Sequence, residues 1–339
     1  SQYEILGKQL RDRCIAGLGR YSKIPDGLHM RLEEELATVR TLGYEPYFLA
    51  VADIARSARE KGIRIAARGS GAGSLINYLL GISGVEPIAH GLLMERFCSI
   101  QRGELPDIDI DVESHRRLEV YDLIFKRFGN ERTATVAMVE TYKARHAIRD
   151  VGAALGIAPM EIDLIAKSLP HIRARNIAKA LENLPELKSL KLDTPLMKTA
   201  IHLAAKLDGL PRHLSMHPCA ILLADRTLHD VAPVDINASG YPMVPFDKDD
   251  VEDLGLLKLD VLGVRMQSAL TYAIQEVKRI DGIDLDLDTV PLDDKDTFDL
   301  IQSTRTIGLF QIESPGQREL IGKFAPTTFN DLIIDCLLY

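Results

Sequence analysis

The sequence predicts a mixed α/β fold, in which a mixed β-sheet is interrupted by a basic helical insertion and followed by further helices. Short β-branched or apolar runs, typical of strands, occur on both sides of residues 141–210. Residues 141–210 themselves show only short helical patterns. Residues 114–213 hold 17 Lys and Arg against 11 Asp and Glu, although the whole chain has a net charge of −8. That local excess fits a contact with nucleic acid or simply a solvated helical surface.

Length and composition indicate an ordinary globular protein of two or three domains, since a chain of 339 residues is longer than a domain with a single hydrophobic core usually is. The sequence shows neither an apolar run of about 20 residues nor a signal peptide at its start, so we expect a cytoplasmic protein that does not enter a membrane. The cysteines are too far apart for a paired zinc motif or a disulfide framework. We expect them to be reduced and mostly buried; they are Cys14, Cys98, Cys219 and Cys336.

The first 65 residues are predicted to be helical. Apolar residues recur there three or four apart on one face, at Leu32, Leu36, Val39 and Leu42. A second helix, near "DIARSAREKG", is predicted to stop at Gly62. The order that follows is strand, glycine loop and helix, in "IRIAA", "RGSGAGS" and "LINYLLGI".

Further along, an amphipathic helix, "HRRLEVYDLIFKRFG", precedes a strand, "TATVAMVE". In the helical insertion, Thr194 is a predicted N-cap, with Pro195 in the first turn and Gly209 as a stop. Strand patterns return at "CAILLA" and "LLKLDVLG", and a long helix, "VRMQSALTYAIQEVKRI", comes next. The chain ends on the apolar stretch "DLIIDCLLY", which indicates a fragment.

Three aspartates alternate with isoleucines in "PDIDID". On a strand, Asp107, Asp109 and Asp111 would share one face while Ile108 and Ile110 point into the core. Clustered carboxylates of this kind can hold two Mg²⁺ ions for phosphoryl transfer, but charges on an edge strand also prevent aggregation. The same alternation recurs in "DLDLD" at 284–288, where turn-forming neighbours indicate a solvated connector. Alternation therefore leaves both interpretations open.

Two other features bear on the same chemistry. The loop "RGSGAGS" could bring backbone amides to a phosphate at a helix N-terminus, or it could be a tight turn. It lacks the lysine of a Walker A loop. Asp260 lies in the apolar strand "LLKLDVLG", with Lys258 two positions earlier on the same face. These two residues could form a local ion pair, or they could be a metal ligand beside a lysine that contacts phosphate.

Together these segments resemble the bacterial DNA polymerase III alpha subunit, the family C DNA polymerases, whether replicative or error-prone. The family's glycine-serine motif matches "RGSGAGS", its "PD-x-D-x-D" motif matches "PDIDID", and its third aspartate falls in "KLDVLG". Further similarity lies at "AIRDVGAALG", "FDKDDVEDLGLLK" and "GLFQIESPGQREL". The resemblance implies a palm with the polymerase-beta-like nucleotidyltransferase fold, split by a helical thumb and followed by the start of helical fingers. The implied boundaries are 1–139 and 213–280 for the palm, 140–212 for the thumb and 281–339 for the fingers.

The resemblance also implies roles for individual residues. Asp107, Asp109 and Asp260 would be the catalytic ligands of two Mg²⁺ ions, whereas Asp111 would not be a ligand. The residues implied near the phosphates of the incoming nucleotide are Arg68, Gly69, Ser70, Arg96, Arg102 and Lys258. The residues implied to contact DNA are Lys143, Arg145 and Arg149.

The implied function is template-directed DNA synthesis, in which the primer 3′ hydroxyl attacks a deoxynucleoside triphosphate and pyrophosphate leaves. The alternative is a palm and thumb fragment that binds duplex DNA without catalysis of its own. A nucleotidyltransferase with a small acceptor is disfavoured by the thumb-like insertion. Implied partners are primer-template DNA, deoxynucleoside triphosphates and, through regions outside this chain, a sliding clamp and other replication or repair subunits.

The sequence departs from the family pattern at "HPCAILL". Pro218 and Cys219 stand where glycines are usual. His213 and His217 lie four apart near Cys219, but a fourth ligand at zinc-binding spacing is lacking, and the family has no zinc there. A zinc site is therefore not predicted.

Overall fold

The computed structural model describes residues 2–99, 108–183, 194–287 and 290–338. The chain divides into two compact units, Ser1–Leu123 with Val261–Tyr339, and Ile124–Asp260. The chain passes between the units within helix α5 (Arg117–Phe128) and strand β7 (Leu257–Val264).

The N-terminal part of the first unit is helical, as predicted. Its helices are α1 (Gln2–Gly17), α2 (Leu28–Leu42) and α3 (Glu45–Glu60), with the 3₁₀ turn η1 (Leu18–Arg20) after α1. On α2, Leu32 and Val39 are buried and Leu36 is half-buried, which confirms the apolar face. Gly62 follows α3 with a positive φ of 66°, a conformation that glycine adopts without strain.

The predicted order of strand, glycine loop and helix is also present. These elements and those that follow are β1 (Ile65–Ala67), η2 (Gly69–Gly73), α4 (Leu75–Leu79), η3 (Met94–Arg96), β2 (Asp109–Glu113) and η4 (Ser114–Arg116). Strand β1 pairs antiparallel with β2, with Ala66 opposite Asp111 and Ala67 opposite Ile110. In the order of strands, β2 lies between β1 and β7.

Helices complete the first unit. They are α11 (Arg265–Asp281), α12 (Lys295–Gln302), α13 (Pro315–Phe324) and α14 (Phe329–Leu338). Ile301, Ile312 and Ile321 form a small core here, with Leu332 against it. Between α11 and α12, Asp284 and Asp286 lie in an exposed connector, as expected for the "DLDLD" stretch.

The second unit combines strands with a helical insertion. Outside the insertion it contains four strands entirely within the unit, a 3₁₀ turn and a short helix. These are β3 (Thr133–Thr141), β4 (Pro211–Leu223), η7 (Leu228–Asp230), β5 (Asp235–Ile236), β6 (Pro242–Val244) and α10 (Lys248–Asp253). The strand order is β7-β4-β3-β6-β5. Only the β3–β6 pair is parallel among these described pairs. The predicted α/β class with a mixed sheet is therefore confirmed.

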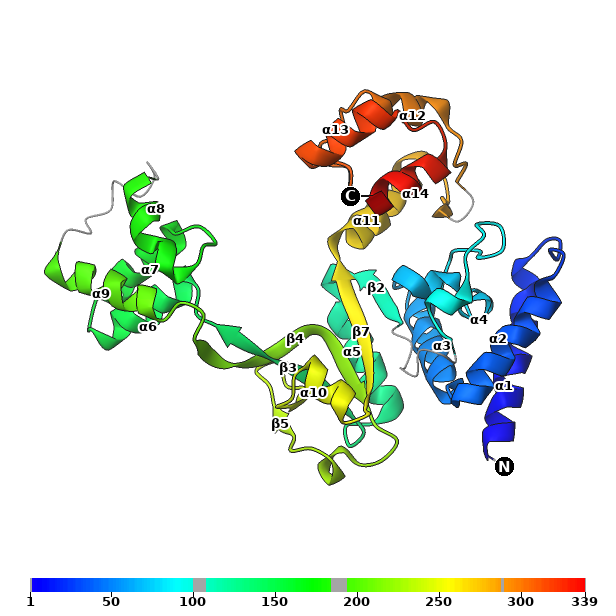
Figure 1. The fold of residues 1–339 in the computed structure, drawn as a ribbon, viewed down its shortest axis with the longest axis horizontal. Helices are drawn as coiled ribbons and strands as arrows, with labels where there is room; N and C mark the ends of the chain where they lie inside the picture. The colour runs from blue at the N-terminus through cyan, green and yellow to red at the C-terminus, as the bar shows by residue number, and fades with distance from the viewer. Residues whose placement is uncertain (1, 100–107, 184–193, 288–289, 339) are drawn as a thin grey trace. The chain divides into compact units, whose positions relative to one another are not determined.

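The helical insertion has its own core. It contains α6 (Ala144–Ala154), α7 (Pro159–Ser168), η5 (Ala174–Asn176), α8 (Ile177–Asn183) and α9 (Pro195–Lys206). Buried apolar residues from these helices pack together, among them Ile148, Ile165 and Met197. The helices gather at one end of the long β3–β4 pair (Figure 1), where the Tyr142 and Gly209 backbones are hydrogen-bonded. Thr194 caps α9 by accepting a hydrogen bond from the Met197 amide, as predicted.

One boundary differs from the sequence prediction. The "CAILLA" pattern placed a strand near residue 219, yet β4 begins at Pro211. The residues from 211 to 219 are exposed or half-buried, so they lack the apolar run that marked the later part of the strand. Pairing with β3 makes this part extended, and such long-range pairing leaves no local sequence pattern.

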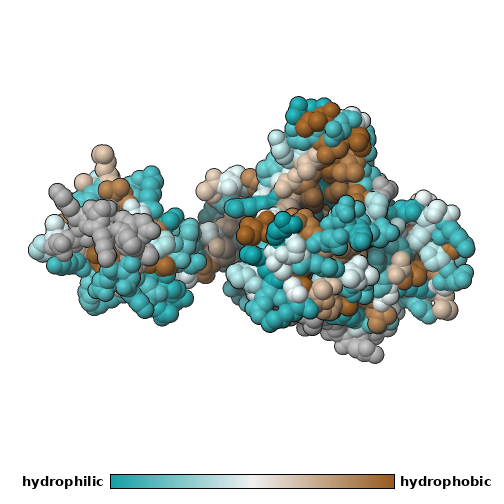
Figure 2. Space-filling view, turned by 90° about the horizontal axis from the view of Figure 1, so that it is seen from above, coloured by the Kyte–Doolittle hydropathy of each residue, from teal (hydrophilic) through white to brown (hydrophobic). Residues whose placement is uncertain are grey.

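Figure 2 shows one face of the molecule, which is largely hydrophilic and carries apolar patches of different sizes. In the helical insertion, Met160 is 87% exposed and Leu164 is 58% exposed. Within the described part of the chain, no helix has the length and apolar character needed to cross a membrane.

An ion pair joins the helical insertion to β4. The Arg212 guanidinium donates to both carboxylate oxygens of Asp150 on α6, at 2.8 and 3.4 Å. This hydrogen bonding, together with the Tyr142 hydroxyl, holds the pKa of Asp150 below its ordinary value. Since the folded pKa lies below the unfolded one, the stabilisation is present above the unfolded pKa of about 3.9 and is lost as pH falls through the folded pKa.

We therefore expect Asp150→Asn to lower the free energy of unfolding by about 0.5 to 1 kcal/mol at pH 7, a modest value because the carboxylate is 37% exposed and screened by solvent. Urea unfolding at pH 7 and in strong acid measures this difference, which should vanish in strong acid. Asp225→Asn, at an exposed turn, is the matched control. An equal loss at both pH values would contradict an ionic contribution.

Candidate functional site

Strand β2 carries the alternating aspartates. Ile108 and Ile110 are buried, with 0% and 1% of their surfaces exposed, whereas Asp109 and Asp111 are half-buried. The alternation of a strand therefore places these two carboxylates on one face, as predicted. Asp107 lies outside the described residues.

The glycine loop contacts this strand through Arg68. The Arg68 backbone amide donates to the Asp109 carbonyl at 3.0 Å. The Arg68 guanidinium lies 3.0 Å from the Asp111 carboxylate. Burial raises the pKa of Asp111, while Arg68 opposes the rise. The structure thus gives Asp111 a partner that the sequence left undefined.

The positions predicted to contact nucleotide phosphates are open to solvent at the loop. Arg68, Gly69 and Ser70 are exposed, and Gly69 has a positive φ of 66°. Arg96 is also exposed, on the turn η3, which contacts the loop turn η2. Arg102 lies outside the described residues.

The far end of the loop is closely packed. A Cβ atom added to Gly73 would lie 2.6 Å from the backbone oxygen of Leu93, and a backbone atom cannot move away cheaply. We expect Gly73→Ala to destabilise the chain by about 1 to 3 kcal/mol through this overlap. Thermal unfolding measures the loss. Gly19→Ala is the control, since a Cβ there meets no atom within 4 Å; equal unfolding temperatures for the two variants would contradict the prediction.

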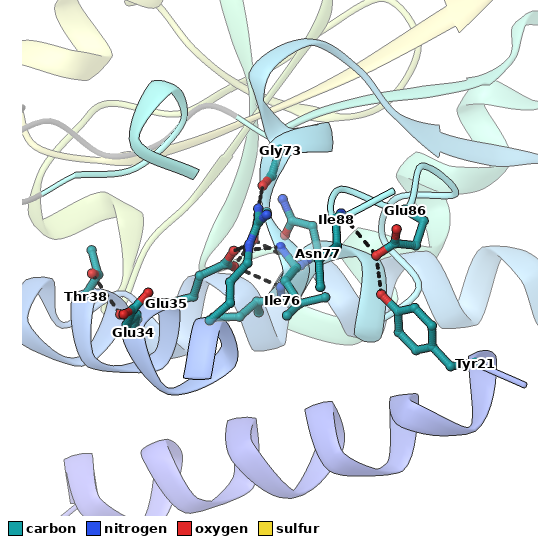
Figure 3. A network of polar contacts seen from close by, with 12 residues as sticks. Tyr21, Glu34, Glu35, Thr38, Gly73, Ile76, Asn77, Glu86 and Ile88 are labelled. Carbon is teal, nitrogen blue, oxygen red and sulfur yellow. Dashed lines mark hydrogen bonds and ion pairs between the residues drawn. The ribbon is translucent and has the colours of Figure 1, made fainter. Parts of the chain in front are cut away.

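Helix α4, which follows the loop, already has an anion at its N-terminus. The buried Glu35 carboxylate accepts hydrogen bonds from the Leu75 and Ile76 amides at 3.0 and 3.1 Å, and from the Ser74 hydroxyl at 3.1 Å. From the sequence, this place could have held a phosphate. In the structure the first-turn amides of α4 are occupied by a side chain of α2 (Figure 3).

Arg31 completes this buried network. Its guanidinium donates to Glu35 at 3.0 Å and to the Gly73 carbonyl at 2.7 Å, so it links the carboxylate to the loop (Figure 3). Burial raises the pKa of Glu35, and the Leu75 and Ile76 amides and Arg31 oppose this. The part of the loop most open to a ligand is therefore Arg68 to Ser70.

Asp260 lies in the second unit, on β7, in a mixed polar cluster. The Lys258 ammonium donates to its Oδ2 at 2.8 Å, and both side chains are nearly buried, with 9% and 15% exposed. The Cys219 thiol lies 3.7 Å from its Oδ1. The local Lys–Asp pair considered from the sequence is therefore formed.

His217 adjoins the same cluster. Its Nδ1 lies 3.5 Å from the Cys219 sulfur and accepts a hydrogen bond from the Ala220 amide at 3.1 Å. Burial lowers the pKa of His217, although the Asp260 charge opposes this. The histidine and the cysteine are neighbours in the sequence, but no local pattern connects them with Asp260, which is 41 residues away from Cys219.

The three predicted DNA-contacting residues lie on α6 or at its N-cap. Lys143 is exposed at the N-cap position. The Arg145 guanidinium donates to the Leu169 carbonyl at 2.8 Å, and Arg149 pairs with Asp163 at 2.7 Å. Both arginines thus have partners within the helical insertion.

The remaining cysteines fit the expectation of reduced, buried thiols. Cys14 and Cys98 are buried, and burial raises their pKa values to about 12 and about 11. Cys219 is half-buried. The Cys336 side chain lies outside the described residues.

Comparison with known proteins covers nearly the whole chain. The model of the bacterial DNA polymerase III alpha NTPase domain matches residues 6–263, and the model of the finger domain of the same subunit matches residues 266–339. The matched finger region starts at α11, whereas the sequence analysis placed the start of the fingers at residue 281.

Curated relatives agree with the family models. The error-prone DNA polymerase of Symbiobacterium thermophilum is 38% identical over 315 residues, which cover 93% of this chain and 29% of that protein. The DNA polymerase III subunit alpha of Bacillus subtilis is 35% identical over 332 residues, covering 97% of this chain and 30% of that protein. The chain thus spans about 30% of the length of these relatives. It belongs to the family of bacterial DNA polymerase III alpha subunits.

Proposed function

We propose that the chain is the palm, thumb and initial fingers segment of a template-directed DNA polymerase, which transfers a deoxynucleotidyl group from a deoxynucleoside triphosphate to a primer 3′ hydroxyl. The main support within the structure is the tie between β2 and the glycine loop. Through the contact of Arg68 with Asp109, an open loop suited to phosphate adjoins a strand that carries two carboxylates on one face.

The carboxylates suit Mg²⁺, which prefers hard oxygen ligands. We propose Asp107, Asp109 and Asp260 as the ligands of two ions. Asp109 fits this role because its neighbours Ile108 and Ile110 anchor the strand in the core. Asp260 fits because its oxygens have only Lys258 and Cys219 as described hydrogen-bond donors, so lone pairs remain for a cation. When bound, such ions activate the attacking hydroxyl and stabilise the charge that develops on the phosphate.

The chain's own residues would position the nucleotide. Gly69 and Ser70 lack the bulk that would keep phosphate oxygens from their backbone amides, and Arg68 would add positive charge. We propose that the Asp111 carboxylate holds the Arg68 side chain in place, since the two are 3.0 Å apart. Arg96, Arg102 and Lys258 are proposed as further phosphate contacts.

The helical insertion is proposed to hold the duplex backbone. It lies in the segment with an excess of six positive charges. Positively charged side chains bind the phosphates of DNA whatever its base sequence. Lys143 is the best placed of the predicted contacts, because it is exposed. Arg145 and Arg149 could reach DNA only by sharing or exchanging their present partners.

The boundaries of these parts, with the thumb at 140–212, stay part of the proposal. So do a cytoplasmic location and the partners of a longer polymerase, including a sliding clamp. The alternative, duplex binding without catalysis, is supported by the short length of the chain relative to its relatives, since the enzyme of Symbiobacterium thermophilum is matched over only 29% of its length.

Two measurements on the 339-residue chain separate these functions. Fluorescence anisotropy with labelled primer-template should show binding that weakens steeply with salt, as expected for phosphate contacts. Primer extension with Mg²⁺ and deoxynucleoside triphosphates then tests catalysis by the chain itself. Binding with no extension favours the DNA-binding alternative for this segment, and the absence of salt-dependent binding would contradict both.

A further inference from the structure

We propose that His217, Cys219 and Asp260 form a binding site that prefers Zn²⁺ to Mg²⁺. The three residues all lie in the second unit, and one potential ligand atom from each lies within 4.8 Å of the other two. The proposal of zinc binding stands independently of the polymerase activity. Asp260 is also a proposed Mg²⁺ ligand, and only an effect of zinc on catalysis would rest on that proposed function.

A bulge in β4 brings the histidine and the cysteine together. Thr135 of β3 pairs with Ile221, but Ala137 pairs with Met216, so four residues of β4, 217–220, lie opposite the single residue Val136. Extra residues on one strand kink it and redirect its side chains. Two alternate residues of this bulge, His217 and Cys219, thereby approach each other, with 3.5 Å between the Nδ1 and Sγ atoms.

Pairing on the other edge of β4 supplies the third ligand. Ala220, directly after the cysteine, lies opposite Asp260 of β7. The Asp260 Oδ1 atom is 3.7 Å from the Cys219 sulfur, while Oδ2 is held by Lys258 at 2.8 Å. The lysine thus orients the carboxylate with one oxygen toward the cysteine, as the outer partners of metal ligands usually do.

These separations match those between the ligands of a tetrahedral zinc ion. Zinc bonds of about 2.3 Å to sulfur and about 2.1 Å to nitrogen or oxygen, at the tetrahedral angle, place sulfur about 3.6 Å from either partner. The observed distances are 3.5 Å to nitrogen and 3.7 Å to oxygen. The ligand atoms of His217 and Asp260 lie within 4.8 Å of each other, and a tetrahedral ion would hold them about 3.4 Å apart. Two of the three separations are therefore already those of a bound ion.

The ligand chemistry selects the metal. Thiolate and imidazole are soft or borderline ligands that favour Zn²⁺ over Mg²⁺. The Nδ1 atom of His217 accepts the Ala220 amide hydrogen bond, so it carries the lone pair that a metal requires. A zinc ion would displace the hydrogen bonds that Nδ1 accepts from the Cys219 and Ala220 amides, and the Cys219 thiol would release its proton to solvent.

The number of ligands sets how firmly the ion is held. Among the described residues, three side chains of this kind converge here, and a tetrahedral zinc ion takes four ligands. The fourth position would therefore be open to water or to another small ligand. We expect exchangeable binding and not a permanently held structural ion.

Binding is tested with Zn²⁺ alone and with Co²⁺ as its spectroscopic substitute, using the 339-residue chain. Titration calorimetry should give one Zn²⁺ per chain, and Co²⁺ should give the charge-transfer absorption of a thiolate ligand. Cys219→Ala and His217→Ala should each weaken Zn²⁺ binding by more than about 100-fold, because loss of a ligand costs more than loss of an outer partner. His213→Ala is the matched control, since this histidine lies on the same strand and contacts Glu140 instead.

A second measurement covers the case in which a variant fails to fold. In the unaltered chain, Zn²⁺ but not Mg²⁺ should slow alkylation of Cys219, followed by mass spectrometry, with buried Cys14 and Cys98 as internal references. No thiolate absorption with Co²⁺, or alkylation of Cys219 at the same rate with and without Zn²⁺, would overturn the site. Neither readout depends on polymerase activity, so failure of the proposed function would leave this test intact.

Discussion

Replacing Asp109 or Asp260 by Asn is expected to lower primer extension by more than about 1,000-fold in a full-length polymerase that contains this segment. Asparagine keeps the size of the side chain but removes the charge needed to hold a divalent cation, and such an ion contributes several kcal/mol to the transition state. We expect the fold to survive, because asparagine keeps a side-chain oxygen that can accept from Lys258 at position 260, and the apolar residues beside both aspartates form the core. Single-turnover extension with Mg²⁺ measures the loss. Asp107→Asn should behave in the same way.

The chain contains its own control for this prediction. Asp286 belongs to the second alternating stretch and lies in an exposed connector, so Asp286→Asn should extend primers at the normal rate. Normal extension by Asp109→Asn or Asp260→Asn would refute the proposed ligands. Equal losses in all the variants, including Asp286→Asn, would point to a general effect of charge.

Replacing Glu35 by Ala is expected to destabilise the chain by about 3 to 5 kcal/mol. The substitution leaves Arg31 and the Leu75 and Ile76 amides without their buried acceptor, and breaking a buried charged network from one side has this cost. Because Arg31 also holds the Gly73 carbonyl, the glycine loop should loosen together with α4. Urea unfolding gives the free energy, and amide hydrogen exchange reports on the loop.

Glu34→Ala is the matched control, because the neighbouring glutamate is exposed on the same helix. It should change the free energy of unfolding by less than about 0.5 kcal/mol. Glu35→Gln should fall between the two, because its amide keeps one acceptor oxygen but turns a donor toward other donors. A result for Glu35→Ala equal to that for Glu34→Ala would show that the network contributes little.

Local patterns predicted the elements that depend on nearby residues. The apolar spacing of α2, the cap at Thr194 and the alternation of Ile108 and Ile110 all follow from geometry within one helix or strand. The early start of β4 could not be predicted in this way, because its first residues are extended by pairing with β3. Likewise, nothing around Glu35 indicates that it is buried, since segments distant in sequence, α4 among them, cover it.

The sequence by itself determined the α/β class and the family, because both follow from short motifs and periodicities. The same motifs, through the family resemblance, single out the aspartates proposed as metal ligands. Tertiary structure alone decided the long-range partners of the charged groups. It paired Asp111 with Arg68, put a glutamate where a phosphate was considered, and brought His217 and Cys219 to Asp260. Such contacts join residues tens of positions apart, so they depend on strand register and helix packing, which no local pattern records.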